Sequence, residues 1–156
     1  MVKQYQHILV PLDSSELAEL ALDDALSIAS LSGAEVTLLH VATPIEKVIA
    51  ADTDHPVFVD QQWDERKMLA RDYLDKICSR LDCKNVTVHT EVAMGMPAET
   101  IIEYTHDHPI DLIVMATHGR SGLQRWVYGS VADKVLRGAN VPTLLVRART
   151  GNGAVE

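Results

Sequence analysis

Two short runs of the chain are almost wholly apolar, and they constrain the fold more than any other feature. They are HILVPL at residues 7–12 and DLIVMAT at residues 111–117. A strand with one face in water alternates apolar and polar residues, so uniform apolarity predicts strands that are covered on both faces. Such strands are typical of the parallel sheets of α/β proteins, and we expect the first run to be central.

The rest of the chain alternates extended and helical periods. Further strands are predicted at 35–42, 85–93 and 141–147, and the alternating sequence of the second of these favours a half-exposed edge. Helices are predicted from the N-cap candidates at 13–15 to Gly33, over 61–81, from Pro97 through Tyr104, and over 130–139. The pattern predicts an α/β fold with an open, parallel, five-stranded sheet and helices on both faces.

Two local features of this pattern need separate mention. The 43–60 stretch exceeds the usual ~2 to 6 residues of an α/β connection, so we interpret it as a functional flap or a mobile excursion. Ser130 and Asp133 have the spacing of a capping box, which predicts Ser130 as the N-cap of the last helix.

The length of 156 residues corresponds to one domain, which we place at 1–148 with a frayed tail at 149–156. Cys78 and Cys83 have no further cysteine partners and are interpreted as free thiols in a reducing compartment. The first residues lack the apolar segment of a signal peptide, and no apolar run approaches the ~18 residues of a membrane span. We therefore expect a cytoplasmic protein without membrane insertion.

Charge is distributed unevenly along the chain. The net charge of −8 argues against a general nucleic-acid binder, because phosphate backbones need a basic surface. Residues 1–111 hold 8 basic and 20 acidic side chains, whereas residues 112–156 hold 6 basic and 2 acidic ones. An anionic ligand is therefore expected near the last third of the chain.

Several common catalytic motifs are absent from the sequence. It has neither the P-loop pattern G-x-x-x-x-G-K-[ST] nor G-x-G-x-x-G after the first strand. It also lacks the G-x-S-x-G nucleophile elbow and the H-E-x-x-H metal pair.

Two segments remain as candidates for ligand binding. Gly119 is followed by nine residues and then by Gly129-Ser130 at the start of a helix, where free N–H groups favour an anion. A loop glycine and a helix N-cap are the alternative interpretation. Asp13 ends the first strand and either caps the next helix or accepts hydrogen bonds from ribose hydroxyls. Ligands of open parallel sheets bind at the carboxyl ends of strands where strand order reverses. If the first and fourth strands are neighbours there, Asp13 and the 116–130 segment face one crevice.

The chain resembles the universal stress protein family over nearly its whole length. The matching pieces, in order, are ILVPLDSSE at 8–16, His40-Val41, GMPAETI at 95–101, DLIVMATHGRSG at 111–122 and GSVADKVLRGANVPTLLVR at 129–147. The resemblance implies strand order 3-2-1-4-5, a homodimer, and in many members bound ATP, with Mg²⁺ expected beside it.

The resemblance also implies roles for individual residues. The family pattern G-x-x-G, nine residues, G-[ST] appears here with Ala116 in place of the first glycine, then Thr117 and Gly119. A positive φ at Ala116 would disfavour alanine and weaken the case for ATP. Phosphates are expected at Gly119, Gly129 and Ser130, helped by the backbone amides of Arg120 and Val131. Asp13 is expected to hold the ribose. The adenine is expected to be framed by Pro11, Leu12, Val41 and Met115, with Val41 contributing through its backbone.

Other side chains have weaker claims to a functional role. Histidine side chains ordinarily titrate near neutral pH, but His40 and His118 lack an evident carboxylate partner, so packing or hydrogen bonding is the favoured interpretation. Arg120 and Arg125 either attract the anion or are solvated. Trp126 and Tyr128 either pack within their loop or cover a nucleotide. His106 and His108 are a weak candidate for a metal site, because two ligands do not complete one.

An apolar last strand at the edge of a sheet exposes unpaired backbone groups. Pairing with its copy through Thr143, Leu144, Leu145 and Val146 would cover it, in agreement with the implied homodimer. The alternative is a monomer whose tail covers that edge.

These observations favour a dimeric ATP-binding regulator that contacts an unidentified protein partner. A slow ATPase is the second hypothesis. Its turnover is expected to be slow because no residue that activates water is evident. The third is an interaction module of the same fold that binds no nucleotide, which Ala116 would favour.

Overall fold

A computed structural model describes residues 2–44, 59–117 and 129–148 of the chain. Several expectations from the sequence concern residues outside these ranges. They include most of the 43–60 stretch, the 149–156 tail, and the candidates His118, Gly119, Arg120, Arg125, Trp126 and Tyr128.

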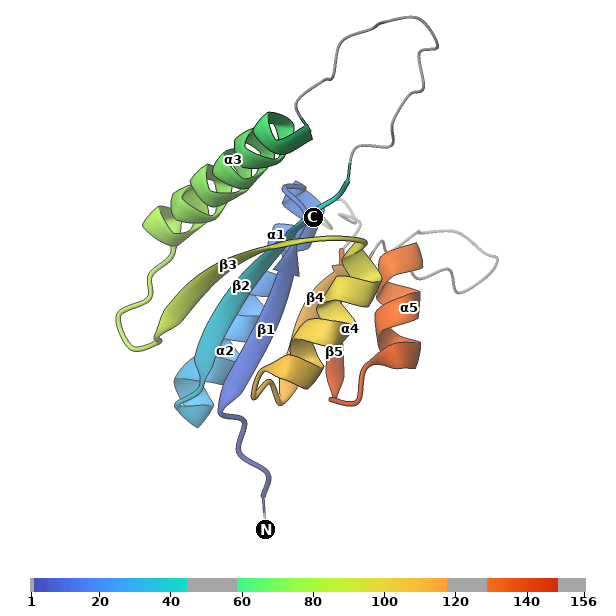
Figure 1. The fold of residues 1–156 in the computed structure, drawn as a ribbon. Coiled ribbons are helices and arrows are strands. Elements are labelled where there is room, and N and C mark those ends of the chain that lie inside the picture. The colour runs from blue at the N-terminus through green and yellow to red at the C-terminus, as the bar shows by residue number, and fades with distance from the viewer. Residues whose placement is uncertain (1, 45–58, 118–128, 149–156) are drawn as a thin grey trace, which may run out of the picture.

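The described residues form an open sheet of five parallel strands flanked by helices (Figure 1). The strands follow the order β3-β2-β1-β4-β5, so the predicted fold class and strand order are confirmed. Their bounds are β1 His7–Leu12, β2 Glu35–Ala42, β3 Val88–Met94, β4 Leu112–Thr117 and β5 Thr143–Arg147. The helices are α1 Glu16–Glu19, α2 Ala21–Ser32, α3 Val59–Arg80, α4 Pro97–Asp107 and α5 Ser130–Gly138.

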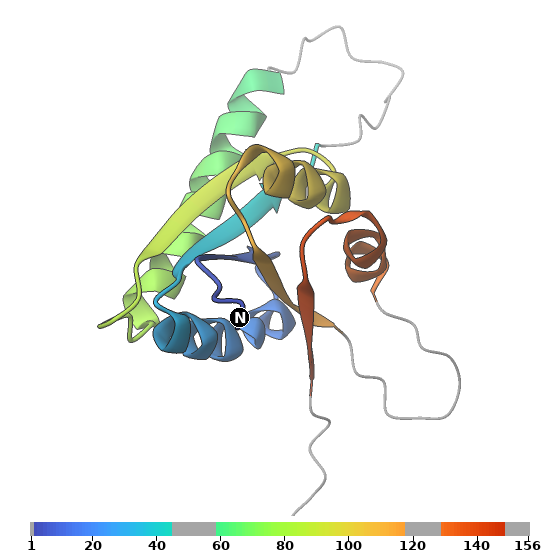
Figure 2. The same ribbon diagram turned by 90° about the horizontal axis from the view of Figure 1, so that it is seen from below.

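The sheet has an apolar cluster on each face. On one face, α2 and α3 pack over side chains such as Ile8, Val10 and Leu38. On the other, α4 and α5 pack over Leu9 and Ile113 and their neighbours. Figure 2 views the sheet from below and shows helices on both sides of it. Because β1 and β4 are covered on both faces, their uniform apolarity is explained.

The two edges of the sheet differ from its centre. Along β3 the burial of successive side chains alternates little. Its exposed residues lie toward the middle of the strand, as expected of a half-exposed edge strand. β5 forms the other edge, where Leu144 is 38% exposed. The central strand β1 pairs with β2 on one side and with β4 on the other, so strand order reverses there. The carboxyl ends of β1 and β4 therefore mark the expected position of a ligand crevice.

Two predictions of local structure are wrong. The first helix is not continuous to Gly33, because the chain turns at Leu20 and separates α1 from α2. The capping box at Ser130 and Asp133 is absent: Gly129 is the N-cap, and Ser130 is the first helical residue. The Asp133 carboxylate instead accepts a 3.0 Å hydrogen bond from Arg137 Nε, one turn later in α5.

Candidate functional site

A cavity of about 260 Å³ opens at the carboxyl ends of the central strands. It brings together two segments far apart in sequence: the end of β1 with Asp13, and the start of α5 with Gly129. The crevice therefore lies where strand order reverses, as the topology predicts.

Most of the residues that the sequence selected line this cavity. They are Pro11, Leu12, Asp13, Val41, Met115, Ala116, Thr117, Gly129, Ser130 and Val131. Gly119 and Arg120 lie outside the described residues. The structure thus brings these residues together around one cavity. That they bind a ligand there stays a prediction.

Other lining residues were missed by the sequence reasoning. They are Ser15, Leu17, Ala18, Leu39, Pro97, Ile101 and Ala132. Leu39 lies two residues before Val41 in a strand, so side-chain alternation gives a signal for it. Leu17 and Ala18 on α1, and Pro97 and Ile101 on α4, become lining residues only through helix packing.

The turn after β1 is held by its own side chains. Asp13 Oδ1 accepts hydrogen bonds from the backbone N–H of Ser15, at 3.0 Å, and from the Ser15 hydroxyl. The Ser15 Oγ accepts a 3.1 Å hydrogen bond from the N–H of Ala18 and is the N-cap of α1. Ser14 between them has a φ of 69°, a conformation that costs a non-glycine residue energy. Asp13 thus supports the cap rather than forming it, and its Oδ2 has no hydrogen-bond partner among the described residues.

The start of α5 presents backbone donors at the same cavity. Gly129, the N-cap, has φ −51° and ψ 150° and makes no side-chain capping bond. The helix of 9 residues carries a partial positive charge at this end, and its first N–H groups lack carbonyl partners within the helix. This end of α5 is suited to an anion.

Thr117 supplies a buried hydroxyl at the end of β4. The residue is 3% exposed, and its Oγ1 has no hydrogen-bond partner among the described residues. A buried hydroxyl without a partner costs ~1–3 kcal/mol, so a hydrogen-bonding group in the cavity would stabilise it.

Ala116 fits its position without backbone strain. It lies in β4, paired with Val146 of β5, and Ser14 is the only non-glycine residue with positive φ in the described ranges. The concern that alanine has to adopt a positive φ here therefore does not apply.

His40, His106 and His108 do not line the cavity. The ring of His40 meets the Tyr73 ring edge-on at 5.8 Å, which agrees with a packing role. Burial lowers the pKa of His40, against smaller raising effects of a Leu12 backbone hydrogen bond and the Asp13 charge. His108 stacks on Tyr104 at 3.8 Å, and no metal-binding group of His, Cys, Asp or Glu occurs among the described residues. Cys78 and Cys83 are free thiols, and burial raises the pKa of each.

The fold and its crevice together define a doubly wound α/β domain with a cavity at the switch point of the sheet. The chain belongs to the universal stress protein family, whose family model matches residues 4–147. The universal stress protein MJ0531 of Methanocaldococcus jannaschii is 32% identical, over 92% of this chain and 82% of that protein. The structure of universal stress protein UspA from Lactobacillus plantarum is 28% identical, has a TM-score of 0.74, and is matched over 94% of this chain and 100% of that one.

Two solved structures of the same fold carry adenine nucleotides. One is a universal stress protein in complex with cAMP, with 20% identity, a TM-score of 0.63, and coverage of 93% of this chain and 98% of that one. The other is a universal stress protein from Archaeoglobus fulgidus in complex with dAMP, with 20% identity and a TM-score of 0.58. That match covers 92% of this chain and 98% of the other.

Within residues 2–44, 59–117 and 129–148, none of the helices combines the length and apolar character needed to cross a membrane.

Proposed function

We propose that this chain binds ATP in the cavity at the carboxyl ends of the strands and acts as a stress-response regulator. The observation that carries the proposal is that Asp13 and the Gly129–Ser130 helix start line one cavity. The adenine nucleotides in two solved neighbours support this class of ligand.

The phosphates are assigned to the start of α5. Backbone N–H groups at Ser130 and Val131 and the helix dipole favour negative charge there. Gly129 has no side chain to obstruct their approach. Gly119 and Arg120 are proposed for the same role from the sequence.

The nucleoside is assigned to the part of the cavity at the ends of β1, β2 and β4. The side chains of Leu12, Val41 and Met115 offer an apolar setting for the base, with Pro11 beside them. Asp13 Oδ2 is free to accept hydrogen bonds from ribose hydroxyls, and the Thr117 hydroxyl supplies another polar contact. The cavity, about 260 Å³, is close to the lower end of the ~300–1,000 Å³ typical of ligand pockets, so the phosphates extend to its rim.

A magnesium ion fits this arrangement mainly through the phosphates. Mg²⁺ usually takes one or two carboxylates together with phosphate oxygens and waters. Asp13 is the single carboxylate among the described lining residues. When bound, Mg²⁺ would neutralise phosphate charge, while Asp13 would contribute at most one ligand.

Slow hydrolysis is the first alternative to pure binding. Efficient phosphoryl transfer needs a group that positions or activates water. Asp13 is the only acid or base among the described lining residues, and its Oδ1 already accepts two hydrogen bonds from Ser15. We expect phosphate release by the pure protein to be far slower than the ~1 per second at the low end of typical enzymes, and a rate near that value would contradict the assignment.

The second alternative is an interaction module that binds no nucleotide. Equilibrium dialysis with labelled ATP and Mg²⁺ separates this module from the proposed function. Saturable binding eliminates the module, and absence of binding up to millimolar ATP eliminates the proposed function. Mass analysis of nucleotide extracted from the purified protein tests the base independently.

The regulator is proposed to be a homodimer joined through β5 and to contact a protein partner whose identity is unknown. Edge position and a partly exposed Leu144 support pairing between copies along Thr143–Val146.

A further inference from the structure

The short helix α1 forms a wall of the cavity but has little of its own to hold it in place. Leu17 and Ala18 line the cavity, yet α1 spans only Glu16–Glu19 and contains no buried residue. A single helical turn is unstable in isolation, because one turn of hydrogen bonds does not offset the cost of ordering it. The position of this wall must therefore be set by neighbouring elements.

The Ser15 cap holds the start of α1, and the helix that follows in sequence, α2, lies beyond its other end. Helix α2 is fixed to the sheet by Ala21, Leu22, Ala25 and Ala29, which are buried. The chain turns at Leu20 between the two helices, and Leu20 is 45% exposed. Because the turn separates them, anchoring α2 does not by itself fix the direction of α1.

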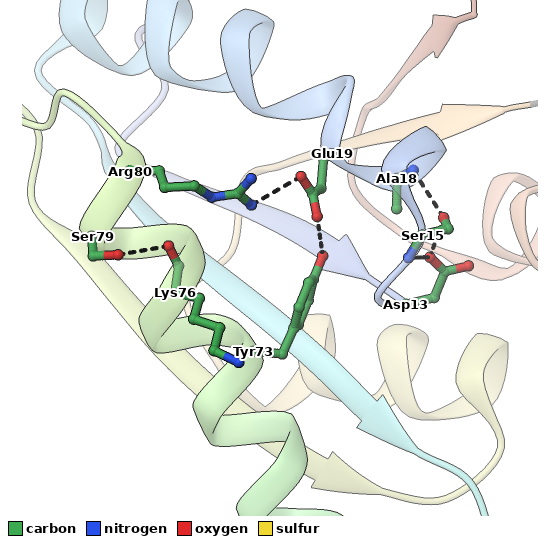
Figure 3. A network of polar contacts seen from close by, with 8 residues as sticks. All are labelled: Asp13, Ser15, Ala18, Glu19, Tyr73, Lys76, Ser79 and Arg80. Carbon is green, nitrogen blue, oxygen red and sulfur yellow. Dashed lines mark hydrogen bonds and ion pairs between the residues drawn. The ribbon is translucent and has the colours of Figure 1, made fainter.

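α1 also packs against β4 and β1, and its last residue makes a further contact with α3. The Tyr73 hydroxyl donates a 3.1 Å hydrogen bond to Glu19 Oε1, and Arg80 Nη2 lies 3.1 Å from Glu19 Oε2 (Figure 3). Both carboxylate oxygens at the end of α1 are thus bound by one distant helix. The Arg80 side chain is 62% exposed, so this ion pair is screened by solvent and the Tyr73 bond carries more of the constraint.

Tyr73 is well placed to act as a fixed point. The neighbouring Leu74 and Ile77 of α3 are 1% exposed and attach the helix to the sheet. The Tyr73 ring also meets the ring of His40 on β2. Burial first, and then the Glu19 charge, raise the pKa of Tyr73, so its hydroxyl remains a donor over the physiological range.

We propose that Glu19, Tyr73 and Arg80 form a latch that holds α1 against α3 and thereby positions Leu17 and Ala18 as the wall of the ligand cavity. The three latch residues do not line the cavity, so they are positioning residues. The ligand named in this inference rests on the proposed function, whereas the latch itself rests on the contacts of the protein alone. Since coupling is reciprocal, a ligand that needs the wall in place must also favour the closed latch.

The latch is tested first without any ligand. Tyr73→Phe keeps the ring and removes the hydroxyl, and we expect hydrogen–deuterium exchange of the α1 amides to become about three- to tenfold faster. Exchange in α4 and in the strands should not change. Unchanged exchange across Glu16–Leu20 in Tyr73→Phe would overturn the latch.

Matched variants separate the latch from general loss of stability. Ser79→Ala removes a hydroxyl on α3 that donates only to Lys76 O within the same helix, and it should leave α1 exchange unchanged. Glu19→Gln keeps an acceptor for the Tyr73 hydroxyl and should stay close to the original protein, whereas Glu19→Ala should match or exceed Tyr73→Phe. Equal effects of Glu19→Gln and Glu19→Ala would contradict the hydrogen bond as the constraint.

ATP binding provides the second arm of the experiment. Tyr73→Phe and Glu19→Ala should raise the dissociation constant of ATP about three- to tenfold, with Glu19→Gln and Ser79→Ala near the original value. Faster α1 exchange with an unchanged dissociation constant would refute the positioning role. If the original protein binds no ATP, the proposed function fails, while the exchange results still decide whether the latch exists.

Discussion

The Ser15 hydroxyl lies between two partners, donating to Asp13 Oδ1 and accepting from the Ala18 N–H at 3.1 Å. This arrangement connects Asp13, which is proposed to bind the ribose, to α1, whose side chains line the cavity. One side chain therefore orients Asp13 and starts α1.

Ser15→Ala should remove the cap of α1 and one of the two hydrogen bonds to Asp13 Oδ1. We expect a loss of about 1 kcal/mol in the free energy of unfolding, as for other N-cap serines, and weaker ATP binding because only the residue-15 N–H still orients Asp13. Urea unfolding and equilibrium dialysis measure the two. Ser27→Ala on α2, whose hydroxyl donates to Asp23 O, is the control and should leave the affinity for ATP intact.

Gly129→Val should weaken ATP binding tenfold or more, about 1.4 kcal/mol, by placing a branched side chain where phosphates approach. The φ of −51° and ψ of 150° at Gly129 are open to valine, so the domain should stay folded. Ala139→Val, at the other end of α5, has a similar extended backbone and should bind ATP normally. An unaltered dissociation constant in Gly129→Val would move the phosphates elsewhere.

Thr117→Val removes a buried hydroxyl that has no partner among the described residues. Its free energy of unfolding should be unchanged or higher by up to about 1 kcal/mol, while ATP affinity falls several-fold. Thr105→Val is the contrasting variant, because the Thr105 hydroxyl donates to Ile102 O at 2.7 Å. Thr105→Val should lower stability and spare ATP binding. An unchanged ATP affinity in Thr117→Val would show that Thr117 has no contact with the ligand.

Stability should fall as the pH is lowered below 6.5, partly because of His40. Burial lowers the pKa of His40 below its ordinary 6.5, so the unfolded chain takes up a proton more readily than the folded one. Stability is therefore retained above 6.5 and lost progressively on acidification. Urea unfolding of His40→Gln from pH 7.5 to 5 should show a shallower loss, while His106→Gln, at an exposed position, should follow the original protein. Burial also lowers the pKa of His7, so part of the slope should remain.

Leu144→Lys should weaken the proposed homodimer at least tenfold, because it places a charge on the edge strand that would pair with its copy. Analytical ultracentrifugation over a concentration series measures the shift toward monomer. Leu31→Lys changes a residue that is 89% exposed on α2 and should leave the assembly unaltered. A dimer of the same strength in both variants would place the interface elsewhere.

The sequence by itself determined the order and type of the elements and the central strands. Uniform apolarity over Ile8–Leu12 and Leu112–Thr117 reflects burial on both faces. A run of consecutive residues contains this pattern, so it can be read from the sequence directly. Local signatures of strand ends and helix starts selected Asp13, Gly129 and Ser130, and the family resemblance supplied the other predicted residues that line the cavity. The N-cap of α5 was misplaced by one residue, since Gly129 provides an extended backbone there without a capping side chain.

Only the tertiary structure decided how α1 is separated from α2 at Leu20 and what holds it. Glu19 and Tyr73 are 54 residues apart, and their hydrogen bond depends on how α3 packs on the sheet. The contribution of Pro97 and Ile101 to the cavity lining likewise depends on where α4 packs on the sheet. No short stretch of sequence contains these contacts, because they arise from the packing of whole helices against the sheet rather than from local periodicity.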